Sequence, residues 1–243
     1  MQTSNIGGIG DFGKLALLRH VMKGRRLGVC WYPAGETSDK SDGKSNFEYL
    51  SRPEEFRHLA PEVFDALREI AGRFSAVGDS LTALQMSGIM GDTMFLRNEV
   101  PTRASLRRAW VEGLVSSVRD ANLVFLDPNN GVQGKRLTCR HVALAEIAAL
   151  RRPDRSLIIG HRHSGRRAEA RFLLGQMRSL GCDPVEIIRL RLVTSRFYVI
   201  CDHDALMTDL IAGFVRKWGN WAKAYCIEPL RSTATRCDST PAW

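Results

Sequence analysis

This sequence lacks a Cys-x-x-Cys pair, a long apolar run and an apolar signal segment. Each absence argues against a class of protein. The six cysteines include no Cys-x-x-Cys pair, so their spacing indicates no structural zinc site. No apolar run approaches the roughly 18 residues of a membrane-spanning helix, and no apolar signal segment follows the first residues. We therefore expect a cytoplasmic protein with no membrane partner and with reduced, mostly buried cysteines.

Acidic residues are also scarce relative to basic ones. The 243 residues include 35 Lys and Arg against 26 Asp and Glu, which leaves a formal charge of +9. A surplus of this size favours an anionic partner, and nucleic acid is the first candidate. With 44% hydrophobic residues and no internal repeat, the chain predicts one α/β domain over residues 1–230. Residues 231–243 lack periodicity and are expected to form a mobile tail.

Short apolar runs alternate with segments of helical periodicity along most of the chain. Strands are predicted at 26–32, 93–97, 121–125, 157–160, 186–192 and 196–201. Helices are predicted at 14–22, 61–70, 105–118, 141–150, 166–180 and 205–218, while 79–90 fits either. The last two strands are joined by only three residues, which forces antiparallel pairing. The order predicts a three-layer α/β sandwich whose mostly parallel sheet is closed by an antiparallel C-terminal hairpin.

The most informative stretch, Asp127-Pro128-Asn129-Asn130, directly follows a predicted buried strand. Open α/β sheets place their ligands at this end of the strands, although the same residues are also typical of a turn. The stretch resembles the Asp-Pro-Pro-Tyr element of methyltransferases that modify amino groups of nucleic-acid bases. The resemblance implies that Asp127 and the Pro128 carbonyl accept hydrogen bonds from the target amino group. Asn129 and Asn130 stand where that family has a second proline and a ring that stacks on the flipped base.

Two other segments resemble those that hold the cofactor in ribosomal RNA adenine-N6 methyltransferases. Asp11 and Lys14 match the Asp-x-x-Lys-His segment that opens the family, here within a glycine-rich opening expected to be a loop. Residues 31–37 stand in the place of Asp-x-His-Ala-Gly-x-Gly, of which only Ala-Gly remains. The resemblance implies that S-adenosylmethionine is held by Gly10, Asp11, Lys14, Trp31, Tyr32, Gly35 and Glu36. Candidates for the missing stacking ring are Phe12, Trp31 and Tyr32.

Imidazole and guanidinium groups follow the strand predicted at 157–160. His161 is expected on the functional rim near Asp127, where we count it among the catalytic residues. The planar guanidinium of arginine suits phosphate groups, and arginines are dense just behind this strand. The predicted contacts to a nucleic-acid backbone are Arg162, Arg166, Arg167 and Arg171.

Taken together, the chain resembles a Rossmann-like class I methyltransferase that uses S-adenosylmethionine and acts on nucleic acid at a base amino group. It also looks like members of a bacterial family of uncharacterised activity, on the Gly-Asp-Phe-Gly-Lys opening and the Asp-Pro-x-Asn-Gly element. One alternative is a metal-dependent nuclease or phosphohydrolase using Asp127, His161 and His163 with Asp202 or Asp204. Another is a non-catalytic Rossmann-like module that binds nucleic acid.

Both enzymatic interpretations depend on one geometric expectation. The carboxylate of Asp127 should emerge from the carboxyl edge of the sheet into an open crevice. It should also lie close to the loop that leaves the first strand.

Overall fold

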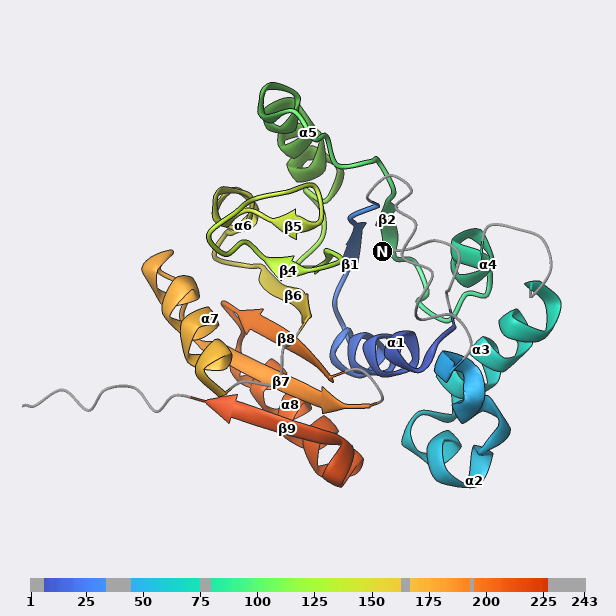
Figure 1. Cartoon of the computed structure of the whole chain (residues 1–243). Helices are drawn as coiled ribbons and strands as arrows, with labels where there is room; N and C mark the ends of the chain where they lie inside the picture. The colour runs from blue at the N-terminus through green and yellow to red at the C-terminus, as the bar shows by residue number, and fades with distance from the viewer. Residues whose placement is uncertain (1–6, 34–44, 75–79, 163–166, 193–194, 227–243) are drawn as a thin grey trace, which may run out of the picture.

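The computed structural model describes residues 7–33, 45–74, 80–162, 167–192 and 195–226. These residues build a seven-stranded sheet with helices on both faces (Figure 1). The strands, in their order across the sheet, are β2 (Met94–Leu96), β1 (Leu27–Trp31), β3 (Leu123–Asp127), β6 (Ser156–Arg162), β8 (Ser195–Cys201), β7 (Val185–Arg191) and β9 (Ala222–Cys226). A separate two-stranded sheet pairs β4 (Gly131–Val132) with β5 (His141–Val142).

The main sheet is mostly parallel. Strands β2, β1, β3, β6 and β7 run one way, and β8 and β9 run the other way. The predicted C-terminal hairpin is confirmed, because β7 and β8 pair antiparallel from Val185↔Cys201 to Arg191↔Ser195. The returning strand β8 inserts between β6 and β7, which leaves β9 as the edge strand. The fold is therefore mixed α/β, as expected, with β4, β5 and β9 as strands that the sequence pattern does not indicate.

Helices cover both faces of the sheet, as Figure 1 shows. One face packs against α1 (Ile9–Val21), α3 (Pro61–Phe74), α4 (Ser80–Met86) and α8 (Ala205–Trp218). The other packs against α5 (Ala104–Ser117), α6 (Leu144–Leu150) and α7 (Arg167–Ser179). Short helical turns complete the described chain: η2 (Ser45–Ser51), α2 (Pro53–Phe56), η3 (Arg57–Leu59) and η4 (Gly219–Trp221). None of the helices within the described ranges is long and apolar enough to cross a membrane.

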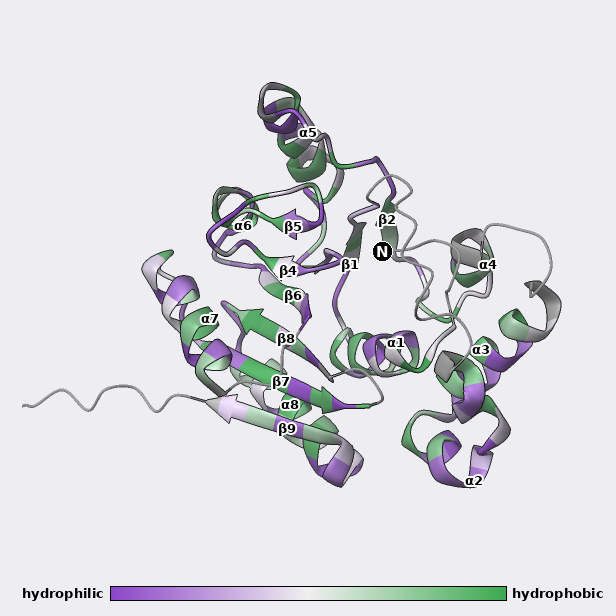
Figure 2. Cartoon of the chain, viewed as in Figure 1, coloured by the Kyte–Doolittle hydropathy of each residue, from purple (hydrophilic) through white to green (hydrophobic). Residues whose placement is uncertain are grey.

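The sheet separates two hydrophobic cores because successive side chains of a strand point to opposite faces. In β3, Leu123 and Phe125 belong to the core under α1, whereas Val124 and Leu126 belong to the core under α5 to α7. A strand buried on both faces reads as a continuous apolar run, which is why β3 can be recognised from the sequence. Figure 2 shows hydrophobic colouring along much of β8, and along β7 the same colour interrupted by hydrophilic residues.

Two predicted helices have different beginnings in the structure. The glycine-rich opening is not a loop throughout, because α1 begins at Ile9 and includes Gly10 and Asp11. The Asp11 carboxylate accepts a hydrogen bond from the backbone N–H of Gly7 (3.0 Å), which satisfies a donor that would otherwise be free at the helix start. The helix predicted at 141–150 begins only at Leu144, because residues 141–142 form β5. The ambiguous segment 79–90 contains the helix α4.

Candidate functional site at the carboxyl edge of the sheet

Asp127 lies where the sequence predicts it, at the carboxyl end of a central strand. It is the last residue of β3 and the register partner of Trp31, the last residue of β1. The loop that leaves β1 therefore starts beside it. The expected open crevice is wrong, however, because Asp127 is only 5% exposed. It is covered by Lys14, which reaches down from α1 on the same face of the sheet.

Lys14 joins the two segments that the sequence singles out. Its Nζ atom lies 2.7 Å from Oδ1 of Asp11 and 2.9 Å from Oδ2 of Asp127. Lys14 is itself 5% exposed, so the two ion pairs are shielded from water. A buried ammonium held by two carboxylates is stable only as a complete set, because removing one member leaves an uncompensated charge. The predicted cofactor residues Asp11 and Lys14 are thus brought to the predicted catalytic residue.

These contacts keep Lys14 and Asp127 charged. Burial alone would lower the pKa of Lys14, but the charges of Asp11 and Asp127 outweigh it and raise that pKa. Burial alone would raise the pKa of Asp127, but the positive charges of Lys14 and Arg196 hold it below its usual value. Burial raises the pKa of the neighbouring Tyr198 to about 12, so its hydroxyl stays protonated at neutral pH.

One oxygen of Asp127 is left for another donor. Lys14 binds Oδ2, and no residue in the described part of the chain donates a hydrogen bond to Oδ1. Oδ1 faces Gly160 of β6, where an added Cβ atom would lie 3.4 Å from it. A glycine here keeps space beside the carboxylate that a larger side chain would reduce. Oδ1 is therefore the atom through which Asp127 can contact a ligand.

Trp31 presents an unpaired donor beside this cluster. Its ring stacks on Phe95, with centroids 6.2 Å apart, and the Lys14 ammonium lies 5.0 Å from the ring centroid. The Nε1 atom is buried and has no hydrogen-bond partner among the residues that the structure describes. Such a donor costs about 1–3 kcal/mol, so it marks a place where an acceptor would be stabilising. The next predicted cofactor residues along the chain, Gly35 and Glu36, lie outside the described residues.

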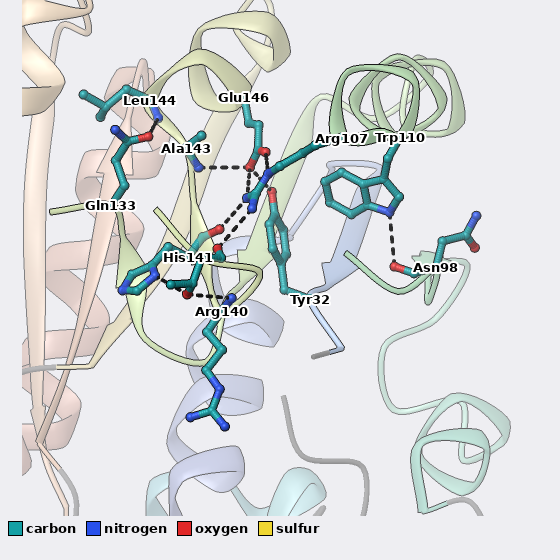
Figure 3. A network of polar contacts seen from close by, with 11 residues as sticks. Tyr32, Asn98, Arg107, Trp110, Gln133, Arg140, His141, Ala143, Leu144 and Glu146 are labelled. Carbon is teal, nitrogen blue, oxygen red and sulfur yellow. Dashed lines mark hydrogen bonds and ion pairs between the residues drawn. The ribbon is translucent and has the colours of Figure 1, made fainter. Parts of the chain in front are cut away.

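Tyr32, in contrast, points to the opposite face of the sheet. Its hydroxyl donates to Oε2 of Glu146 (3.2 Å), and Arg107 binds the same carboxylate (Figure 3). Arg107 also donates to the backbone carbonyls of Thr138 (3.0 Å) and His141 (2.6 Å). The network ties α5, α6 and the β4–β5 segment together behind β1. Tyr32 and Asp127 are thus separated by the sheet, and Tyr32 has a structural partner of its own.

The candidates for a stacking ring are all in the core. Phe12 and Tyr32 are 0% exposed and Trp31 is 1% exposed. Phe12 packs in an aromatic cluster with Tyr49, Phe64 and other rings under α1. None of the three rings can stack on a base at the surface in this conformation.

His161 lies at the same edge as Asp127 but on the other face. Its Nδ1 accepts a hydrogen bond from the N–H of Val132 (3.1 Å), and its Nε2 lies 3.1 Å from a carboxylate oxygen of Glu169 on α7. Gly131 has φ +102°, and a Cβ atom added there would lie 2.2 Å from Nδ1. Both ring nitrogens therefore contact β4 and α7. The prediction that His161 lies near Asp127 on the functional rim is wrong, because the His161 side chain points to the opposite face of the sheet.

The residues that follow Asp127 form a connection to the small sheet. Pro128 is buried, while Asn129 and Asn130 are partly exposed. The backbone N–H of Asn130 donates to the carbonyl of Arg140 (2.9 Å), and β4 begins at the next residue. The two carboxamides therefore lie at the rim above Asp127, in a segment fixed by the pairing of β4 with β5.

The residues proposed for a metal site do not come together. Because β8 is antiparallel to β6, Cys201 pairs with Leu157 at the amino edge, while Phe197 pairs with His161 at the carboxyl edge. Asp202, which follows Cys201, is bound by Arg151 at that far edge. His163 lies outside the described residues. Within the described residues, no group of three or more His, Cys, Asp or Glu side chains could hold a metal ion.

The predicted phosphate contacts are divided between two elements. Arg162 ends β6 at the carboxyl edge, whereas Arg171 is exposed on α7, on the face away from Asp127. Arg166 lies outside the described residues, and the side chain of Arg167 is not described. Sequence reasoning missed Arg196, the register partner of Arg162. Its only sequence signal is its place at the start of the strand after the hairpin turn.

Comparison with known proteins adds no family to this description. No protein-family model matches the sequence, and no curated protein does. The fold and the site thus define a mixed α/β protein with a buried cluster of charged side chains at the carboxyl edge of its sheet.

Proposed function

We propose that the protein is a methyltransferase that uses S-adenosylmethionine and acts on nucleic acid at a base amino group. The supporting observation is the position of Asp127-Pro128 at the end of a central strand, beside the end of β1, with Oδ1 left for a donor. Parallel strands closed by an antiparallel hairpin are also the Rossmann-like order expected of class I methyltransferases. Function resides in such a site and not in the fold alone.

The charges of the cluster suit this cofactor. Asp11 and Asp127 carry two negative charges against the single positive charge of Lys14, so the buried set has a net charge of −1. S-adenosylmethionine would supply an electrophilic methyl group on a positively charged sulfur, and it also carries hydrogen-bond acceptors. Trp31 Nε1 would donate to one of those acceptors, and the carboxylates would favour the cationic part.

Asp127 and Pro128 would act on the target amino group. The lone pair of an exocyclic amino group is conjugated with its base, so the group is a weak nucleophile. Oδ1 of Asp127 and the Pro128 carbonyl would accept its two N–H bonds and draw the lone pair out of conjugation. Lys14 would keep the carboxylate ionised and in place, which is the preorganisation such a step requires.

The low exposure of Asp127 limits which substrates can reach it. A base stacked inside a duplex cannot approach a carboxylate that is 5% exposed below the rim. The base has to be unpaired or turned out of the stack, which costs a few kcal/mol in a duplex and least in a single strand. We therefore expect single-stranded segments to be the better substrates.

Transfer of a radiolabelled methyl group from S-adenosylmethionine to single-stranded RNA and DNA tests the proposal. Asp127→Asn should lower the rate about 10²–10³-fold, the loss typical when one preorganised electrostatic contact is removed. Asp120→Asn is the matched control, because Asp120 is 63% exposed on the other side of the molecule, and its rate should equal the wild type. Equal rates for both variants would overturn the proposal, as would cofactor binding without any transfer.

A non-catalytic module that binds nucleic acid is the second candidate. The observation in its favour is the same low exposure of Asp127, because an ion pair with Lys14 can also serve folding alone. It predicts binding of an oligonucleotide, equally strong in the wild type and in Asp127→Asn, with no methyl transfer by either.

A further inference from the structure

Two arginines lie directly opposite each other on neighbouring strands at the carboxyl edge. Arg162, the last residue of β6, is the register partner of Arg196 near the start of β8. Arg162 is exposed and Arg196 is partly buried. Like charges in this arrangement are destabilising unless an anion lies between them. The pair therefore needs a reason other than folding.

No carboxylate within the described residues neutralises the pair. Neither guanidinium forms an ion pair or a hydrogen bond there. At the amino edge the situation is the opposite: Arg25 binds Asp204 at 2.6 Å and Arg152 binds Asp154 at 2.7 Å. These arginines at the amino edge have carboxylate partners, whereas the cross-strand pair at the carboxyl edge leaves its N–H donors for an anionic ligand.

The pair is also on the same face of the sheet as Asp127. Side-chain alternation from Ile158 and Tyr198, which both belong to the core under α1, places Arg162 and Arg196 on that face. Arg196 is near enough that its charge lowers the pKa of Asp127. Arg162 lies two residues beyond Gly160, the neighbour of Asp127, and thus about 7 Å further along the strand.

We propose that Arg162 and Arg196 together bind a phosphate of a nucleic-acid backbone. Two guanidinium groups side by side provide several N–H donors for the oxygens of one phosphodiester, a charge-assisted and geometrically specific contact. The inference rests on the proposed function in one respect, since the phosphate would belong to the strand whose base reaches Asp127. The binding itself requires neither cofactor nor methyl transfer.

Fluorescence anisotropy with a labelled single-stranded oligonucleotide, without S-adenosylmethionine, measures this contact. The variant R162A/R196A should bind about tenfold or more weakly, and its slope of log affinity against log salt should fall by roughly 0.7, the contribution of one neutralised phosphate on a single strand. The control R68A/R119A removes the same charge from side chains that are 56% and 78% exposed elsewhere. It should leave the slope unchanged. Unfolding curves should show that both variants are folded.

The possible outcomes separate three explanations. Equal losses in the two double variants would mean that only net charge matters and would overturn the proposal. Inorganic pyrophosphate, titrated by calorimetry, represents a small phosphorylated ligand. If R162A/R196A weakens the binding of pyrophosphate but not that of the oligonucleotide, the proposal that the pair binds a nucleic-acid backbone is wrong. Oligonucleotide binding that depends on the pair, without methyl transfer, would support this inference while contradicting the proposed enzyme.

Discussion

The two edges of the central sheet use charged residues in different ways. At the amino edge, Arg151 binds Asp202, and Arg155 donates to the backbone carbonyls of Val118, Ala121 and Leu150 at 2.7–2.9 Å. At the carboxyl edge, the polar groups are incompletely matched among the described residues: one carboxylate oxygen, one indole N–H and two guanidinium groups have no hydrogen-bond or ion-pair partner there. Charged groups that pair with one another stabilise a fold, while charged groups without a partner indicate where a ligand can bind.

A cavity of about 570 Å³ at the amino edge sharpens this contrast. It is lined by Arg151, Asp183, Asp202 and neighbouring residues. Asp202 accepts hydrogen bonds from the Arg151 side chain and from the N–H of Asp183 (3.1 Å), so its carboxylate is already satisfied. The size of a cavity is therefore a poorer guide to function here than the unpaired groups at the other edge.

The largest effect should come from breaking the buried ion pairs at the carboxyl edge. Lys14→Met leaves Asp11 and Asp127 buried without a counter-charge, which typically costs about 3–5 kcal/mol in free energy of unfolding. Urea unfolding measures it. Lys23→Met, at an exposed position, is the control and should change stability by less than about 0.5 kcal/mol. A loss below about 1 kcal/mol for Lys14→Met would show that the set is not buried as described.

A somewhat smaller loss is expected where the edge depends on a glycine. Gly131→Ala places a Cβ atom against His161 at a backbone φ of +102°, so strain and overpacking add to about 2–4 kcal/mol. Gly134→Ala is the control, because nothing lies within 4 Å of its Cβ position. Thermal unfolding measures the stability of both variants. If Gly131→Ala is as stable as Gly134→Ala, the close contact between residue 131 and His161 is contradicted.

The free energy of unfolding at acidic pH should depend on the ionised carboxylate of Asp127. Its pKa is lowered in the folded state, so its contribution is complete above the unfolded value of about 3.9 and is lost as the pH falls through the folded value. Wild-type protein should therefore lose more stability between about pH 5 and pH 2 than Asp127→Asn does. Denaturant unfolding at several pH values measures both slopes. Parallel curves for the two proteins would exclude a stabilised carboxylate at 127.

Trp31→Phe should affect stability least and ligand binding most. The substitution removes the unpaired Nε1 donor while keeping an aromatic ring to stack on Phe95, so we expect a stability change within about 1 kcal/mol. Affinity for S-adenosylhomocysteine should fall about tenfold, as expected when one hydrogen bond to a ligand is lost. Unchanged affinity would mean that the indole N–H faces no ligand.

The main elements of the fold could be predicted from the sequence. Residues 205–218 form α8 with the predicted boundaries, because its apolar residues recur at helical spacing and Asp204 caps its first turn. The short connection after residue 192 correctly indicates the hairpin. The two-residue strands β4 and β5 are too short to leave a periodic signal, and they shift the start of α6.

The place of Asp127 in the fold could be predicted from the sequence, but the arrangement of side chains around it could not. Sequence alone indicates that Asp127 ends a strand, but not which of Trp31 and Tyr32 shares a face with it, since this depends on the register with β3. It also cannot separate Arg151, which pairs with Asp202, from Arg162, which has no partner among the described residues, because both occur in similar arginine-rich stretches. The contact between Lys14 and Asp127 spans 113 positions and becomes visible only in three dimensions.

Calorimetric titration of the protein with S-adenosylmethionine tests the central claim most directly. A second titration uses S-adenosylhomocysteine, the product that lacks the positive charge on sulfur. The claim predicts that both compounds bind saturably with one molecule per chain. Asp127→Asn should bind them more weakly, and Asp120→Asn should have the same dissociation constants as the wild type. Absence of heat with either compound, in protein shown to be folded, would contradict a cofactor site at the carboxyl edge.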